Sequence, residues 1–179
     1  MIFIVLKLNK RNTESSVTVE EVSNKDIAII GIDVSMPMAR NMDEFWENIK
    51  NQIDCVREFP EIRKKDVEDY FKLKGIDASN LKYIESAYFD EIDKFDYSFF
   101  NMSPKEANLM HPLQRTFLET VWKAVEDAGY GNGRLAGSKT GLYIGSISDL
   151  EGYRYKQIIQ DVDPSLLPIA ISGNLSSMI

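Results

Sequence analysis

The side chains most often used as nucleophile and general base, cysteine and histidine, are rare in this sequence. The chain has one cysteine, Cys55, and one histidine, His111. Asp54 and Glu58 flank the cysteine, and negative charge close to a thiol disfavours the reactive thiolate form. Arg57 offsets that effect in part. The pattern therefore favours a structural role for Cys55 over a role as a nucleophile.

The histidine lies at a predicted junction between two helices, directly before Pro112. A lone histidine at such a place is more often a cap or a hydrogen-bonded turn residue than a general base. Arg115 and Glu119 follow four residues apart on the predicted second helix. That spacing favours an ion pair along one helix face over contact between Arg115 and a substrate.

Other site motifs are missing from the sequence. Gly141 and Gly145 belong neither to a GxGxxG fingerprint nor to a GxxxxGK[ST] phosphate loop. Ser176 and Ser177 have no GxSxG elbow around them. One cysteine and one histidine are too few for a zinc site of three or four Cys/His ligands. We therefore assign no catalytic, cofactor-binding or metal-ligating residue.

The composition is that of a globular protein, with 44% hydrophobic and 27% charged residues in a chain of 179. A formal net charge of −7 argues against binding to nucleic acid or to anionic lipid. No apolar run approaches the roughly 20 residues that span a bilayer. A single cysteine excludes an internal disulfide and fits a reducing compartment, so we expect a cytoplasmic protein.

Residues 1–25 are predicted to form a leader and linker ahead of the folded domain. Residues 1–8 are apolar but short, and they lack the basic region and the cleavage site of a signal peptide. A stray strand or an unfolded leader is therefore favoured. Residues 9–25 are rich in Ser, Thr, Glu and Asn, as linkers are. We expect the domain itself to span residues 26–179.

The first part of that domain is predicted to hold one strand and one helix. Residues 27–32 are continuously apolar, which is typical of a strand buried on both faces. A helix is predicted over residues 42–51, with Asn41 as its N-cap. Residues 60–82 are charged and indicate a surface excursion with short helical pieces. Residues 86–100 are rich in aromatic side chains, and we expect an extended connection over the core.

Two consecutive helices are the clearest local signal. Ser103 and Glu106 have the spacing of a capping box, with proline at the first helical position. The sequence before Pro112 then predicts that this short helix ends or kinks. A second helix is predicted over residues 113–128, with a wide apolar stripe and with Gly129 just beyond its end.

The last segments are predicted to be a turn, a strand and partly irregular chain. Residues 131–138 form a glycine-containing turn, and residues 140–145 are a second candidate core strand. Residues 148–165 are acidic and irregular, with helix around 153–160. Residues 173–179 resemble a glycine turn that enters a helix. Because the sequence stops one turn into that helix, we expect the fold to be incomplete.

Seven stretches of the sequence form an ordered set. They are residues 26–31, 42–49, 95–107, 110–119, 124–130, 141–145 and 173–177. In order and spacing they resemble the start of a ketosynthase, the β-ketoacyl synthase domain of modular polyketide synthases. The resemblance covers about residues 26–179, and it is greatest to bacterial synthases whose acyltransferase is a separate (trans-acting) protein.

This resemblance implies the thiolase-like fold, a layered α/β/α/β/α architecture, of which the chain would form the N-terminal half only. The family reaction is a decarboxylative Claisen condensation. A cysteine takes the acyl chain from the phosphopantetheine of an acyl carrier protein, and two histidines assist decarboxylation of carrier-bound malonyl. The implied partners are the carrier protein, the remainder of the ketosynthase and a second subunit of a homodimer. No cofactor bound directly, no nucleic acid and no membrane are implied.

None of the three catalytic residues of the family is assigned to this chain. The family cysteine comes in a Cys-Ser-Ser segment beyond residues 173–177, and both histidines lie further on. Cys55 matches a non-catalytic position. His111 stands where the family usually has Asp before Pro-Gln-Gln-Arg, and Leu113 replaces a Gln. The small, glycine-containing stretch after the first strand is altered to Asp33-Val34-Ser35-Met36.

Three functions remain open at this point. The first is a catalytically incomplete part of a polyketide ketosynthase. The second is a non-catalytic docking or scaffold piece of a synthase assembly, and the third is part of a fatty-acid synthase condensing domain. In each case we expect the chain alone to be inactive. Half of a two-half fold leaves apolar surface in water, so the isolated chain is also predicted to be unstable or to self-associate.

Overall fold

The computed structural model describes residues 2–5, 28–145 and 149–172. Strand β1 (Ile2–Val5) pairs antiparallel with β2 (Ile29–Asp33), with Ile2 opposite Asp33. The predicted strand at residues 27–32 is thus confirmed, with its start at Ile29. The predicted stray strand near the N-terminus is β1, whereas the predicted linker falls on residues 9–25, outside the described part of the chain.

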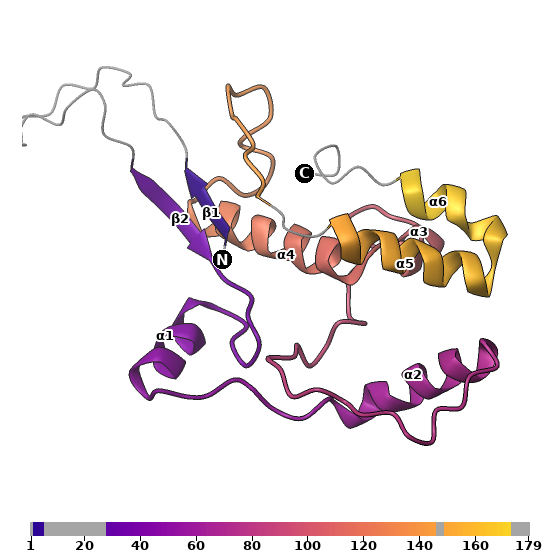
Figure 1. Cartoon of the computed structure of the whole chain (residues 1–179). Coiled ribbons are helices and arrows are strands. Elements are labelled where there is room, and N and C mark those ends of the chain that lie inside the picture. The colour runs from indigo at the N-terminus through magenta and orange to yellow at the C-terminus, as the bar shows by residue number, and fades with distance from the viewer. Residues whose placement is uncertain (1, 6–27, 146–148, 173–179) are drawn as a thin grey trace, which may run out of the picture.

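The expectation that this strand is buried on both faces is wrong. Gly31 and Asp33 are buried, but Ile29 is 60% exposed. The reason is that β2 belongs to a two-stranded sheet, and α4 (Pro112–Asp127) packs against it. Figure 1 shows α4 running from the sheet toward the other helices of the C-terminal half.

Two helices follow β2, and they lie on the same side of α4 in Figure 1. Helix α1 (Met42–Lys50) begins as predicted, because the Asn41 side chain accepts a hydrogen bond from the backbone of Glu44 at 2.9 Å. Helix α2 (Glu61–Leu73) is one continuous helix of 13 residues, so the expectation of short pieces is wrong. Its sequence contains no Gly or Pro that would interrupt it.

The two consecutive helices have the predicted capping. Helix α3 (Pro104–Leu109) starts with a capping box between Ser103 and Glu106. Of the predicted apolar stripe in α4, Leu118 and Val121 are buried, whereas Leu113 is 44% exposed. Ala124, which was not predicted to belong to the stripe, is also fully buried. Packing against β2 is so close that a methyl group added to Gly31 would lie 2.4 Å from the Ala124 carbonyl oxygen.

The predicted second strand at residues 140–145 is wrong: these residues have no regular secondary structure. A strand needs a neighbour to satisfy its backbone groups, and no described strand pairs with this segment. Further along, α5 (Asp149–Val162) is longer than the predicted helix at 153–160. A short 3₁₀ turn, η1 (Pro164–Leu166), and α6 (Leu167–Ser172) follow, and the predicted turn at 173–179 lies outside the described residues.

In the described ranges no helix is both long and apolar enough to cross a membrane.

Candidate functional site

The best candidate for a polar site is the start of α4, where His111 and Arg115 meet side chains from other segments. His111 is the N-cap of α4: its Nδ1 accepts a hydrogen bond from the Leu113 backbone at 3.1 Å. The Gln114 side chain in return accepts from the His111 backbone at 3.3 Å. The predicted structural role of His111 therefore has a specific form, a capping box built from His and Gln.

Tyr155 from α5 lies against this cap. Its ring meets the His111 ring edge to face, with centroids 4.9 Å apart. The Tyr155 hydroxyl donates toward the backbone carbonyls of Asn108 and Met110, at 3.5 and 3.4 Å. Burial raises the pKa of Tyr155, although the charge of Arg115 opposes the shift. The phenol is thus a neutral hydrogen-bond donor that joins α5 to the α3–α4 junction.

The predicted ion pair between Arg115 and Glu119 does not form among the described residues. Arg115 instead points its Nη1 toward the backbone carbonyl of Asp93, at 3.5 Å, and its Nε is buried without a hydrogen-bond partner. Burial raises the pKa of Glu119, and the charges of Lys123 and Arg115 partly counteract that rise. Arg115 and Glu119 therefore attract each other electrostatically over a distance and form no ion pair.

The described contact of Cys55 is within its own loop and does not involve the side chains at the start of α4. Its side chain is partly buried, and its sulfur approaches the backbone carbonyl of Ile53 at 3.9 Å. Arg57, which could have assisted a thiolate, is engaged elsewhere: it forms an ion pair with Asp90 at 2.7 Å and donates to the Tyr88 carbonyl. The described contacts thus provide no base or cation that would activate the thiol.

A cluster of arginines and aromatic rings holds the segment after α2. Arg63 donates to the Phe89 carbonyl at 2.8 Å and lies over the rings of Phe59 and Tyr88. Phe59 in turn stacks on Tyr83, with centroids 4.8 Å apart. Burial lowers the pKa of Arg63, yet a guanidinium keeps its charge at any physiological pH. The cluster therefore holds the segment after α2 in place, because its guanidinium N–H groups donate hydrogen bonds to backbone carbonyls of the same chain.

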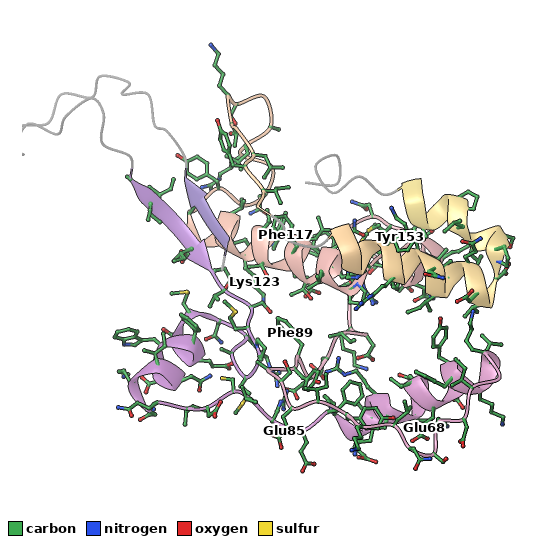
Figure 2. All side chains as sticks on the ribbon, in the orientation of Figure 1. Glu68, Glu85, Phe89, Phe117, Lys123 and Tyr153 are labelled. Atoms are coloured by element: carbon green, nitrogen blue, oxygen red, sulfur yellow. The ribbon has the colours of Figure 1, made fainter. Side chains whose placement is uncertain are left out.

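The buried carboxylate of Asp33 could not be predicted from the sequence. At the end of β2, Asp33 is 7% exposed and its Oδ2 has no hydrogen-bond partner. Burial raises the pKa of Asp33, and the neighbouring Lys123 opposes the rise. Figure 2 shows Lys123 extending from α4 near this end of β2.

Between α2 and α5, the carboxylate of Asp161 accepts a hydrogen bond from the Tyr70 hydroxyl at 2.9 Å and forms an ion pair with Lys74 at 3.0 Å.

These side chains cap a helix, hold a loop segment and connect helices, but the described ones do not form a catalytic site. The part of the chain that the structure describes holds no group of three or more His, Cys, Asp or Glu able to bind a metal ion. His111 is committed to a helix cap, and the contact of the Cys55 sulfur is with its own loop. Ser176 and Ser177, which the sequence does not identify as nucleophiles, lie outside the described residues.

A protein-family model matches most of the sequence. Residues 24–179 match the family model "Beta-ketoacyl synthase, N-terminal domain". The chain is 37% identical over 139 residues to the polyketide synthase PksN of Bacillus subtilis, covering 76% of the chain. It is 45% identical over 116 residues to PksL of the same organism, covering 64%. Each match spans only 2% of the relative.

Solved structures give the same result. The chain is similar to the ketosynthase from module 6 of the bacillaene synthase of Bacillus subtilis, with a TM-score of 0.52 and 34% identity. The match covers 77% of this chain and 24% of the ketosynthase. A variant of the same ketosynthase gives a TM-score of 0.54.

Proposed function

The chain belongs to the β-ketoacyl synthase family as part of its N-terminal domain, and from that premise we propose that it forms the scaffold portion of a polyketide ketosynthase. Its fold is part of the thiolase-like α/β fold of the ketosynthases it matches. The observation that carries the proposal is the family match over residues 24–179, together with a site region in which the only Cys and the only His have structural contacts.

In this proposal the complete domain performs a decarboxylative Claisen condensation. A cysteine outside the 179 residues accepts an acyl group from the phosphopantetheine thiol of a carrier protein, which leaves as the free thiol. A carrier-bound malonyl unit then loses carbon dioxide, and the resulting carbanion attacks the cysteine thioester. The new carbon–carbon bond forms as the thiolate leaves, and the product is a β-ketoacyl chain on the carrier.

This chain contributes packing rather than chemistry to that reaction. Helix α4 buries Leu118, Val121 and Ala124 against β2 and its surroundings, and its capped start orders the α3–α4 junction. Such a scaffold is what positions catalytic groups from other segments within hydrogen-bond reach. The similarity to PksN and PksL supports a bacterial synthase of the type whose acyltransferase is a separate protein. We further infer that the complete domain is a cytoplasmic homodimer.

The proposal is tested by complementation. The chain is mixed with a polypeptide that holds the remaining ketosynthase residues, including the Cys-Ser-Ser segment, and is offered an acyl group on a carrier protein. Intact-protein mass spectrometry should find the acyl group on the complementary polypeptide and the elongated product on the carrier. The chain with Cys55→Ser is the matched control and should support the same loading. Loading that depends on Cys55, or no loading by the mixture, would contradict the proposal.

A further inference from the structure

Residues 57–90 form a long excursion whose two ends are bonded to each other. The backbones of Arg57 and Ser86 form an antiparallel bridge, in which each N–H donates to the other's carbonyl oxygen at 3.0 Å. The Arg57 guanidinium adds an ion pair with Asp90 at 2.7 Å and a hydrogen bond to the Tyr88 carbonyl. We call residues 57–90 the arm and this closed end the base. The base is thus fixed by backbone and side-chain bonds at the same time.

Contacts within the arm extend from the base into α2. Arg63 donates to the Phe89 carbonyl at 2.8 Å and lies over the Phe59 ring. Phe59 stacks on Tyr83, and the Lys64 ammonium lies 5.7 Å from the centre of the same Tyr83 ring. Stacked rings and cations over ring faces are favourable contacts, and these need no partner outside the arm. The first turn of α2 and the returning chain therefore form one unit.

The far end of the arm is bound to the rest of the chain by one carboxylate. Asp161 of α5 accepts a hydrogen bond from the Tyr70 hydroxyl at 2.9 Å and pairs with the Lys74 ammonium at 3.0 Å. For the described residues, every other hydrogen bond, ion pair and ring contact of the arm joins two residues of the arm. Figure 1 shows α2 approaching α5 at this end, away from the sheet.

We propose that the arm pivots about its base, and that Asp161 is the latch that holds its far end on α5. Hydrogen bonds from Lys74 and Tyr70 lower the pKa of Asp161, so the carboxylate is charged at neutral pH and is a strong acceptor for both donors. Opening breaks these two bonds but exposes little apolar surface, because no residue of α2 is buried. Opening is therefore a local event that leaves the base and α5 folded.

Salt should weaken the latch. The side chains of Lys74 and Asp161 are 38% and 20% exposed, so water and ions reach the pair. Exposed ion pairs contribute little to stability, whereas the backbone hydrogen bonds of the base do not depend on charge. An increase in ionic strength should thus free the far end of the arm before it loosens the base.

Pairs of spin labels test the pivot by measuring the distance between α2 and α5. In a Cys55→Ser background, one label is placed at Lys72→Cys on α2 and the other at Gln157→Cys on α5, both at exposed positions. Asp161→Ala removes the acceptor of both bonds and should raise the fraction of molecules at long distances about fivefold. High salt should shift the distribution of the parent in the same direction. A distribution that neither change alters would overturn the proposal.

A second pair of labels distinguishes a pivot from local unfolding. Lys65→Cys and Glu85→Cys place both labels within the arm, again at exposed positions. Because the arm moves as a unit, this pair should keep one narrow distance when Asp161→Ala is added. Equal broadening for the two pairs of labels would show that the arm unfolds, and this would contradict the proposal.

Matched tyrosine variants test the latch without changing Asp161, so they remain informative if Asp161→Ala does not fold. Tyr70→Phe removes one of the two donors to Asp161 and should raise the open fraction about threefold. Tyr83→Phe is the control, because the Tyr83 hydroxyl has no hydrogen-bond partner among the described residues. That variant should leave the distance between α2 and α5 unchanged. Equal distance distributions for the two variants would refute the role of Asp161 as the latch.

Discussion

The carboxylate of Asp127, at the end of α4, accepts a hydrogen bond from the backbone N–H of Ile32 in β2 at 2.9 Å. The two residues are 95 positions apart in the sequence. This bond satisfies a backbone donor in β2, and it lies beside the close approach of Gly31 to α4. The sheet and the central helix of the described structure are therefore joined by a hydrogen bond as well as by packing.

Loss of that bond should lower the stability of the chain. Asp127→Ala removes the acceptor from an exposed position, and we expect the free energy of unfolding in urea to fall by about 1 kcal/mol. Asp127→Asn keeps a carbonyl oxygen at the same place and should retain most of the stability. Glu126→Ala, which is exposed on the same turn, is the control. Equal stability of the Asp127→Ala and Glu126→Ala variants would show that the bond contributes nothing.

A methyl group added at Gly31 should disrupt the packing of β2 against α4. Gly31→Ala would place its Cβ 2.4 Å from the Ala124 carbonyl oxygen and 2.6 Å from the Ala128 Cβ. Overpacking of this kind costs about 1–3 kcal/mol, so the thermal midpoint should fall clearly. Gly131→Ala would make ordinary van der Waals contact with Glu126, at 3.4 Å from its Cγ and 4.0 Å from its Cα, and should unfold like the parent. A Gly31→Ala chain that melts at the parental temperature would contradict the packing described.

The buried carboxyl of Asp33 should make stability depend on pH. Burial raises its pKa above the ordinary value of 3.8, so the folded chain keeps this proton to a higher pH than the unfolded chain does. The stability associated with this proton is present in acid and is lost as the pH rises through the folded pKa. Asp33→Asn does not titrate, so its stability relative to the parent should increase from acidic to neutral pH. Urea unfolding at several pH values measures this, and a difference that is constant with pH would count against it.

His111 should be replaceable by a residue that caps a helix without being a base. His111→Ala removes the acceptor for the Leu113 backbone and should destabilise the chain by about 1 kcal/mol. His111→Asp keeps an N-cap acceptor and places a negative charge at the positive end of the helix dipole, so it should recover most of that loss. Thermal unfolding of both variants at neutral pH decides this. If the two variants lose equal stability, the cap is not the role of His111.

Local chemistry made several elements predictable from the sequence. Asn41 caps α1, and the Ser103–Glu106 box caps α3, because both depend on side chains within three residues of the backbone groups they satisfy. The apolar spacing along α4 likewise predicted part of its buried face, which contains Leu118 and Val121.

The errors arose where distant partners decide the structure. Residues 140–145 have a strand pattern, but a strand forms only beside another strand. Helix α5 is longer than its acidic sequence predicted, and Asp161 on it is bound by Tyr70 of α2 and by Lys74, the C-cap of α2. At the site, the role of Tyr155 against His111 depends on a contact across 44 positions, which spacing along the chain does not reveal.

The central claim is that these 179 residues supply scaffold and that Cys55 is not the reactive sulfur of the ketosynthase. The most direct measurement offers the purified 179-residue chain an acyl group on a carrier protein and then looks for the acyl mass on Cys55 by peptide mass spectrometry. We expect Cys55 to remain unmodified and no elongated product to form after malonyl-carrier is added. An acyl group that transfers to Cys55 and is then elongated would contradict the account.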